Sequence, residues 1–462
     1  MRSVVLLPFE DLRGAEGEPI AEALRIALAQ SLEAQIAVLP VTPSHLRDVA
    51  GIPVTFRVDG YVGPDGFHLS MNGEPVVCKG QFADCLGPLV SQVASRTGAA
   101  APAVPPARAV LALENARKLA SEQGWREAAE AHKNYGPVWL GRIEHAAAGG
   151  AEAALAIAAK AETKDWRPID TARLEVLRAV LVRDKSKTAE TLERLASLVP
   201  ADFQIQQRAA AALLEARRFT GAVARYEHIL SSGPNPAVAN EAAYAALFAG
   251  DRAKAENFVA RARQGAPADT RFIDTAGDVA YYFGDYAAAA RHFASANAHL
   301  KAAEAFAIAG DQKNAEAMLS KQPDDGLNKA LLLWRIKRDA SALEKSANPR
   351  APFFLALAKL AAKDFAGAKA LQQRVKQPSV EFVILSALID APPQNAPEGL
   401  HAIHACLRGD KARCLAQITA AKTKLHPFAD SSLRRIEASV NGEKSTGYLP
   451  AALDDWLAFL AR

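Results

Sequence analysis

The sequence has few cysteines, few aromatic residues and no long apolar run. Its 462 residues include four cysteines and 7% aromatic residues, whereas disulfide-stapled scaffolds are short and rich in cysteine. A helix that crosses a bilayer needs about 20 consecutive apolar residues, and no such run occurs. These absences exclude a small disulfide scaffold and predict a protein without a membrane span.

The common catalytic and phosphate-binding motifs are also missing. There is no G-x-x-x-x-G-K-[ST], no G-x-G-x-x-G, no H-E-x-x-H, no G-x-S-x-G and no C-x-x-C. We therefore predict a protein that is not an enzyme and that needs no cofactor. An enzyme with a site at the junction of an N-terminal domain and the repeats described below is the alternative from a different class.

The charge is nearly balanced, which argues against nucleic acid as a partner. The formal net charge is +4, and residues 1–100 hold seven Lys or Arg and eleven Asp or Glu. The rest of the chain holds 48 basic and 40 acidic residues. A mildly acidic N-terminal segment before mildly basic repeats is a solubility pattern and lacks the concentrated basic patch of a nucleic-acid binder.

Residues 1–98 carry the pattern of a small α/β domain. Short apolar or alternating runs predict strands, and longer runs with a period near 3.6 predict helices. The expected strands are 3–8, 35–41, 54–62, 67–72 and one ending near Val77; the expected helices are 18–34, 43–49 and 83–97.

The opening MRSVVLLPFED has no cleavage site for a signal peptide. This predicts the cytoplasm for a chain that begins natively at Met1, and export if the N-terminus has been trimmed.

A Pro/Ala segment at 99–107 predicts an extended linker, and residues 108–462 are expected to be helical repeats. The repeat is best defined over 203–303, where Ala222, Ala255 and Ala289 recur at steps of 33 and 34 residues. In phase with them stand a small residue (Ala210, Ala243, Gly277), a Gly-Asp turn and an aromatic residue such as Tyr226 or Phe293. Small residues let the two helices of a pair touch, and the aromatic residue fills the gap to the next pair. The sequence therefore predicts a mainly α fold, a tetratricopeptide-type α-solenoid preceded by a small α/β domain.

Weaker copies flank this block. They are residues 139–160 with Ala153, Gly310-Asp311 with Ala315, residues 363–365 with Ala368, and Gly409-Asp410 with Cys414; a last helix is expected at 449–461.

The opening VVLLPFEDL and the later VDGYV with its hairpin resemble the TolB-like N-terminal domain, which precedes tetratricopeptide repeats in many bacterial proteins. Some of those proteins are fused to kinases, cyclases or winged-helix domains, and this sequence has none of these segments. The resemblance therefore implies scaffolding or signalling by protein binding.

The four cysteines leave three interpretations open. We expect reduced thiols at Cys78, Cys85, Cys406 and Cys414, and disulfides within the two close pairs are the alternative. A third, weaker candidate is a metal site at His401, His404, Cys406 and Cys414, because zinc accepts imidazole and thiolate ligands. Cys414 occupies a small-residue position of the repeat, which favours a packing role.

The functional surface of such an array is expected on the concave side, along the first helix of each pair. The template positions predict a partner-binding groove formed by Gln207, Ala211, Leu214, Asn240, Tyr244, Phe248, Arg271, Asp274, Asp278 and Tyr282. The two aspartates are expected to pair with Arg271. A solvated helix face is the structural alternative. The aromatic cluster at 281–286 could stack on nucleic acid, although packing within the helix pair is favoured.

We therefore predict a non-catalytic scaffold or adaptor that binds a protein or peptide segment in this groove. The N-terminal domain would add a second contact or a surface for self-association. A regulatory subunit of an enzyme or signalling complex is the nearest alternative, since it differs only in having an obligate catalytic partner.

Overall fold

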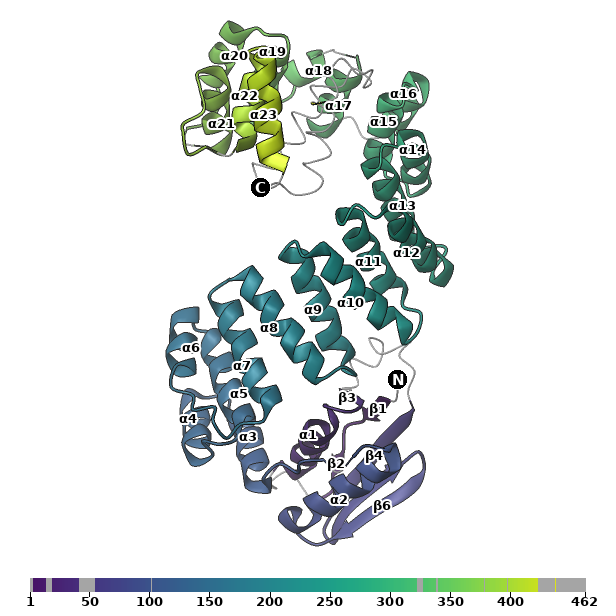
Figure 1. Cartoon of the computed structure of the whole chain (residues 1–462), viewed down its shortest axis with the longest axis vertical. Coiled ribbons are helices and arrows are strands. Elements are labelled where there is room, and N and C mark those ends of the chain that lie inside the picture. Colours follow the sequence, from purple (N-terminus) through teal and green to yellow (C-terminus); the bar gives the residue numbers. More distant parts are fainter. Residues whose placement is uncertain are drawn as a thin grey trace. The chain divides into compact units, whose positions relative to one another are not determined.

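The computed structural model describes residues 3–13, 19–40, 55–100, 102–321, 327–337, 340–377, 379–396, 398–422 and 437. The chain divides into two compact units, Met1–Ala249 (unit 1) and Gly250–Arg462 (unit 2), and each is described by itself (Figure 1). The helices expected at 43–49 and 449–461 lie outside the described residues.

Unit 1 begins with a mixed sheet and two helices, as expected for an α/β domain. The sheet order is β3-β1-β4-β5-β6, with β2 beside β4. Strands β1, β3 and β4 run parallel, and β5 and β6 follow β4 as antiparallel hairpins. The elements are β1 (Ser3–Leu6), β2 (Glu10–Asp11), α1 (Ile20–Leu32), β3 (Ala37–Pro40), β4 (Phe56–Gly63), β5 (Gly66–Met71), β6 (Glu74–Lys79) and α2 (Phe82–Thr97).

The sheet buries one face against the two helices. Side chains alternate along β5, so that Phe67, Leu69 and Met71 are buried, and Leu24 of α1 and Leu89 of α2 belong to the same core. On the other face Tyr61 and His68 stack as cross-strand neighbours, with ring centroids 4.8 Å apart. This alternation is the period-2 pattern of a half-buried sheet.

Helical hairpins complete unit 1. Figure 1 shows the helices following one another in chain order, and each packs on the next, as α7 does on α8 and α8 on α9. The bounds are α3 (Ala107–Leu119), α4 (Glu122–Ala131), α5 (Gly136–Ala147), α6 (Ala151–Ala158), α7 (Pro168–Leu181), α8 (Lys185–Leu198), α9 (Phe203–Glu215), α10 (Phe219–Ser231) and α11 (Pro236–Phe248).

The α/β part and the first helical pairs share one hydrophobic core. That core runs from Val4 of β1 to Leu174 of α7. At the predicted linker, the side chain of Gln35 makes two hydrogen bonds with the main chain of Ala100, 2.6 Å to its nitrogen and 3.3 Å to its oxygen. The domain boundary at 99–107 stays a prediction; the packing shows that the segments on its two sides contact each other extensively.

A cluster of charged residues also joins α1 to the repeats. Arg167 donates two hydrogen bonds to Asp170, at 2.7 and 2.8 Å, and one to the carbonyl of Gln30, at 2.8 Å. Arg173 donates to Glu33 at 2.6 Å, and Asp170 is only 1% exposed. Burial opposes the charge of Arg167, but the hydrogen bond and charge of Asp170, together with Glu33, raise its pKa. Two arginines thus neutralise two buried carboxylates.

Unit 2 is helical throughout its described residues. Its helices are α12 (Arg252–Gly265), α13 (Thr270–Tyr282), α14 (Tyr286–Ser295), α15 (His299–Ile308), α16 (Gln312–Ser320), α17 (Leu327–Lys337), α18 (Ser341–Glu344), α19 (Ala351–Ala361), α20 (Phe365–Gln372), α21 (Val380–Ile389), α22 (Glu398–Leu407) and α23 (Lys411–Lys422). No helix in the part of the chain that the structure describes is both long and apolar enough to cross a membrane.

The repeat positions behave as their spacing predicts. Ala222, Ala255 and Ala289 are fully buried, where the two helices of a pair approach closely. The equivalent residues of the later copies, Ala315, Ala368 and Cys414, are buried as well. In the first copy the buried residue is Ala154, and the predicted Ala153 is exposed. The fold is mainly α, a tetratricopeptide-type α-solenoid that follows a small α/β domain.

The Gly-Asp turns have a physical explanation. Gly284 adopts a φ of +84°, a left-handed conformation that glycine reaches without strain. Asp285 then caps α14, because its carboxylate accepts a hydrogen bond from the Ala288 amide at 3.0 Å. Aspartates at the same position cap α12, α16, α20 and α23: Asp251, Asp311, Asp364 and Asp410.

The cysteines correct an expectation. All four are paired, Cys78 with Cys85 and Cys406 with Cys414, so the prediction of reduced thiols is wrong. The Cα atoms lie 5.6 and 4.9 Å apart, within the range that a disulfide requires. In each case a tight connection folds the chain back, from β6 to α2 and from α22 to α23.

Candidate partner-binding surface

The ten predicted groove residues fall into two sets, one in each unit. The unit 1 surface comprises Gln207, Ala211, Leu214, Asn240, Tyr244 and Phe248, on α9 and α11. All six are half-buried. On each helix they recur every three or four residues, which places them on one stripe, while buried residues such as Ala209 and Ala243 occupy the remaining faces. The stripe therefore lies at the surface.

Gln207 and Glu241 connect the two helices of this surface. The Gln207 amide donates to both carboxylate oxygens of Glu241, at 3.3 and 3.4 Å. Burial raises the pKa of Tyr226, and the adjacent Glu241 carboxylate raises it further. Sequence analysis missed Glu241, although it stands next to Asn240 and one repeat length after Gln207. The contact shows that α9 and α11 present their stripes side by side.

An aromatic group forms one end of the unit 1 surface. Tyr244 and Phe248 have ring centroids 6.2 Å apart, and Phe219 of α10 lies 5.6 Å from Phe248. Nearby on α11, Asn240 has a buried side-chain oxygen that no group of the described chain hydrogen-bonds. Rings of this kind offer contact area at low entropic cost, and the amide oxygen can accept a donor from a ligand.

The unit 2 surface comprises Arg271, Asp274, Asp278 and Tyr282 on α13, and its ion pairs differ from those expected. Arg271 pairs with Asp269, its Nη2 lying 2.6 Å from Oδ2. Asp269 also caps α13 by accepting from the Arg271 amide at 3.0 Å. The prediction that Arg271 pairs with Asp274 and Asp278 is wrong, because the capping aspartate holds the guanidinium at the start of the helix.

Lys301 of α15 is the actual partner of the two aspartates. Its amine lies 2.7 Å from Oδ2 of Asp274 and 3.1 Å from Oδ1 of Asp278. Burial lowers the pKa of Lys301, but Asp278 and Asp274 together raise it above its ordinary value. One ammonium shared by two carboxylates leaves a net charge of −1. The second oxygen of Asp274 is buried and has no hydrogen-bond partner among the described residues.

The neighbouring aromatic cluster packs within its helix pairs. Tyr281 makes an edge contact with Tyr286 at 5.3 Å and lies 6.4 Å from Phe293, and its hydroxyl donates to Glu304 at 3.2 Å. Tyr282 of the unit 2 surface is half-buried and meets the edge of Phe283 at 5.2 Å. These contacts give the cluster a structural role.

The candidate metal site is not supported. His401 and His404 do share α22, but Cys406 and Cys414 are joined in a disulfide and so cannot act as thiolate ligands. Within the described ranges, no three His, Cys, Asp or Glu residues are arranged to hold a metal ion. Burial lowers the pKa of His404, and Arg408 adds to the effect.

Comparisons with known proteins give weak similarities to helical-repeat structures. No family model matches the chain, and no curated protein matches it. A tetratricopeptide repeat protein from Parabacteroides merdae is 14% identical with a TM-score of 0.35, covering 59% of this chain and 98% of that one. A Rap protein complexed with Competence and Sporulation Factor is 14% identical with a TM-score of 0.34, and the match covers 77% of this chain and 99% of that one. In the structure of Naa15/Naa10 bound to HypK-THB, a chain is 15% identical with a TM-score of 0.36, and the match covers 76% of this chain and 64% of that one.

Proposed function

We propose that the protein is a non-catalytic scaffold whose unit 1 surface and unit 2 surface each bind a segment of a protein partner. The observation that carries the proposal is the contact between successive first helices. Gln207 of α9 meets Glu241 of α11, and Lys301 of α15 bridges two aspartates of α13. Such contacts make each surface continuous over two repeats, which suits an extended segment.

The chemistry of each surface suggests what the partner segment carries. At the unit 2 surface, two carboxylates share one amine, so a basic side chain of the partner would find a net negative charge. At the unit 1 surface, Tyr244 and Phe248 offer an apolar platform, and the unfilled oxygen of Asn240 offers an acceptor for a main-chain N–H. We therefore propose that the unit 2 surface binds a segment with basic residues and that the unit 1 surface binds a segment with at least one large apolar residue.

We also propose that the protein works in a compartment that permits disulfides. The support is the pairing of all four cysteines, since disulfides persist in oxidising environments and are rare where thiols are kept reduced. This differs from the cytoplasm expected from the N-terminal residues. The TolB-like resemblance of the α/β domain and its self-association stay predictions.

Capture of the partner by the full chain, followed by affinity measurement with the purified partner, tests the function. Tyr244→Ala with Phe248→Ala should weaken binding by tenfold or more, because aromatic anchors contribute much of an interface's energy. Asp274→Asn with Asp278→Asn should weaken binding and reduce its dependence on salt. Val182→Ala removes an exposed apolar side chain of unit 1 outside the surface and should leave binding unchanged.

Circular dichroism melts of the same variants separate lost contacts from lost folding. Unchanged binding in both double variants, with normal melts, would move the interface elsewhere on the chain. If the partner is an enzyme whose activity this protein regulates, the regulatory-subunit alternative would be favoured instead.

A further inference from the structure

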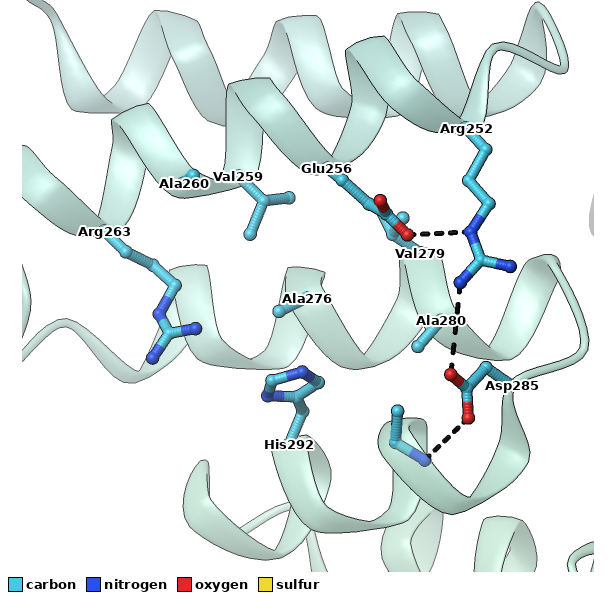
Figure 2. Close-up of a pocket in the computed structure, with 11 residues that line it drawn as sticks. Arg252, Glu256, Val259, Ala260, Arg263, Ala276, Val279, Ala280, Asp285 and His292 are labelled. Atoms are coloured by element: carbon cyan, nitrogen blue, oxygen red, sulfur yellow. Dashed lines mark hydrogen bonds and ion pairs between the residues drawn. The ribbon is translucent and has the colours of Figure 1, made fainter.

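Unit 2 contains a hollow on the side of its second helices. It has a volume of about 220 Å³ and lies between α12 and α14, with α13 as its floor (Figure 2). The floor is apolar, formed by Ala276, Val279 and Ala280 of α13, and Ala288 of α14 lines the hollow beside it. On a helix, Ala276 and Ala280 point away from the side that carries Asp274 and Asp278. The hollow is therefore distinct from the unit 2 surface.

One end of the hollow carries one cation and two carboxylates. Arg252 binds Glu256 at 2.7 Å and lies 3.9 Å from Asp285, as Figure 2 shows. Asp285 is further engaged as the cap of α14. The net charge of this end is therefore −1, which disfavours an anionic group there.

The other end carries two side chains with unused donors. Figure 2 shows Arg263 reaching from α12 and His292 from α14 toward the same region of the hollow. Neither side chain makes a hydrogen bond or ion pair with the part of the chain that the structure describes. An uncompensated guanidinium beside an imidazole, next to an apolar floor, is an arrangement that recognises a carboxylate.

We propose that this hollow binds a small aliphatic monocarboxylate, with the carboxylate between Arg263 and His292 and the hydrocarbon chain over the alanine floor. The proposal does not depend on the partner-binding surfaces, which lie on other residues. It adds a ligand site to a protein whose proposed function is scaffolding.

Size and charge both restrict the ligand. Pockets for drug-sized molecules hold roughly 300–1,000 Å³, so 220 Å³ suits a smaller molecule. With His292 neutral, the charges of Arg252, Arg263, Glu256 and Asp285 cancel. A single negative charge can be accommodated at Arg263, whereas a doubly charged phosphate would meet repulsion from the two carboxylates. The apolar floor also favours a hydrocarbon body over a fully polar ligand.

The charged groups around His292 predict how binding responds to pH. Burial lowers the pKa of His292, and Arg263 of α12 and Arg291 of α14 lower it further, while Asp285 opposes them. From α13, only alanine and valine line the hollow. A bound carboxylate would raise the pKa of His292, so affinity should increase as the pH falls toward that pKa.

The test uses the full chain and 4-methylpentanoate as the probe, followed by calorimetry and by NMR of the His292 ring. We expect saturable 1:1 binding and a shift of the His292 signals. Arg263→Gln should weaken binding about tenfold or more, because it removes a charge-assisted hydrogen bond. Ala288→Leu should abolish it by filling the hollow. Arg261→Gln removes a charge from the same helix outside the lining and should change little.

Three further probes decide the chemistry. 4-Methylpentanamide lacks the charge, acetate lacks the hydrocarbon body, and an acetylated tetrapeptide ending in leucine presents the same group as a peptide terminus. Weak binding of the first two supports the proposal. The proposal is overturned if the amide binds as well as the acid, if Arg261→Gln and Arg263→Gln have equal effects, if no probe binds, or if only the peptide binds.

Discussion

Gly277 of α13 faces the ring of Phe293 of α14 so closely that no side chain fits between them. A Cβ atom on Gly277 would come within 3.0 Å of Cγ of Phe293 and closer still to Cδ1 and Cε1. Phe293 is 2% exposed, so its ring has no free space to move into. The small residue of one helix and the aromatic residue of the other thus fit together as the repeat spacing predicts.

Gly277→Ala should therefore destabilise the protein, although alanine is the better helix former. Overpacking of a core costs about 1–3 kcal/mol, while replacing glycine within a helix contributes up to about 1 kcal/mol of stability. The net loss should be about 1–2 kcal/mol, measured by urea unfolding followed by circular dichroism. Gly221→Ala is the matched control, because a Cβ there would make ordinary contact with Leu213 at 3.6 Å. It should be neutral or stabilising, and equal stability of the two variants would contradict the explanation.

The repeat could be predicted because its determinants are local and recur. Ala222, Ala255 and Ala289 are each required by contact between two helices that are adjacent in sequence, so the requirement recurs at a fixed spacing. The Gly-Asp turns are determined in the same way, by one left-handed residue and one cap. The strands of the α/β domain followed from alternation within short segments.

The electrostatics of the candidate site could not be predicted in the same way. Lys301 lies 27 residues after Asp274, and only the packing of α15 on the neighbouring pair brings them together. The pairing of Arg271 with Asp269 had a local signal, since an aspartate just before a helix is a preferred cap. The repeat template assigns only positions on the helix face, and Asp269 is not one of them. The cysteine pairing could not be predicted from the low cysteine content, because that content describes the whole chain. A disulfide depends instead on the distance between two particular Cα atoms.

Arg167→Ala should cost about 3 kcal/mol of unfolding free energy. The substitution leaves Arg173 as the remaining cation beside Asp170 and Glu33. Asp170 is 1% exposed, and breaking a buried pair costs about 3–5 kcal/mol. A value at the low end is expected because the Arg167 side chain is 26% exposed. Urea unfolding measures the loss, and Arg57→Ala, which removes the exposed pair with Asp59, should have little effect. The double variant Arg167→Ala/Asp170→Ala should recover part of the loss; full additivity would argue against coupling.

Removing the Cys406–Cys414 disulfide should lower stability by roughly 2–3 kcal/mol. The estimate comes from the loop entropy that a bridge between cysteines eight residues apart removes from the unfolded chain. Urea unfolding of Cys406→Ala/Cys414→Ala measures it. A reductant should destabilise the wild type more than this variant, which retains only the Cys78–Cys85 bridge. Alkylation of the unfolded, unreduced protein should label no cysteine, and four labelled cysteines would show that the bridges do not form.

His292 should make the stability depend on pH. Burial, followed by Arg263 and Arg291, lowers its pKa below the ordinary 6.5, against the opposing effect of Asp285. Below pH 6.5 the unfolded chain therefore binds a proton that the folded protein does not bind, and stability falls as the pH falls. Between pH 7.5 and 5.5 the wild type should lose a few tenths of a kcal/mol relative to His292→Gln, a small effect because solvent screens a half-exposed ring.

NMR titration of the ring measures the cause of this effect. The pKa of His292 should lie below 6.5 in the wild type and rise in Arg263→Gln, because one neighbouring positive charge has been removed. Arg261→Gln leaves Arg263 in place and should move the pKa less. A pKa of His292 at or above 6.5 in the wild type would reverse the sign of the predicted pH dependence.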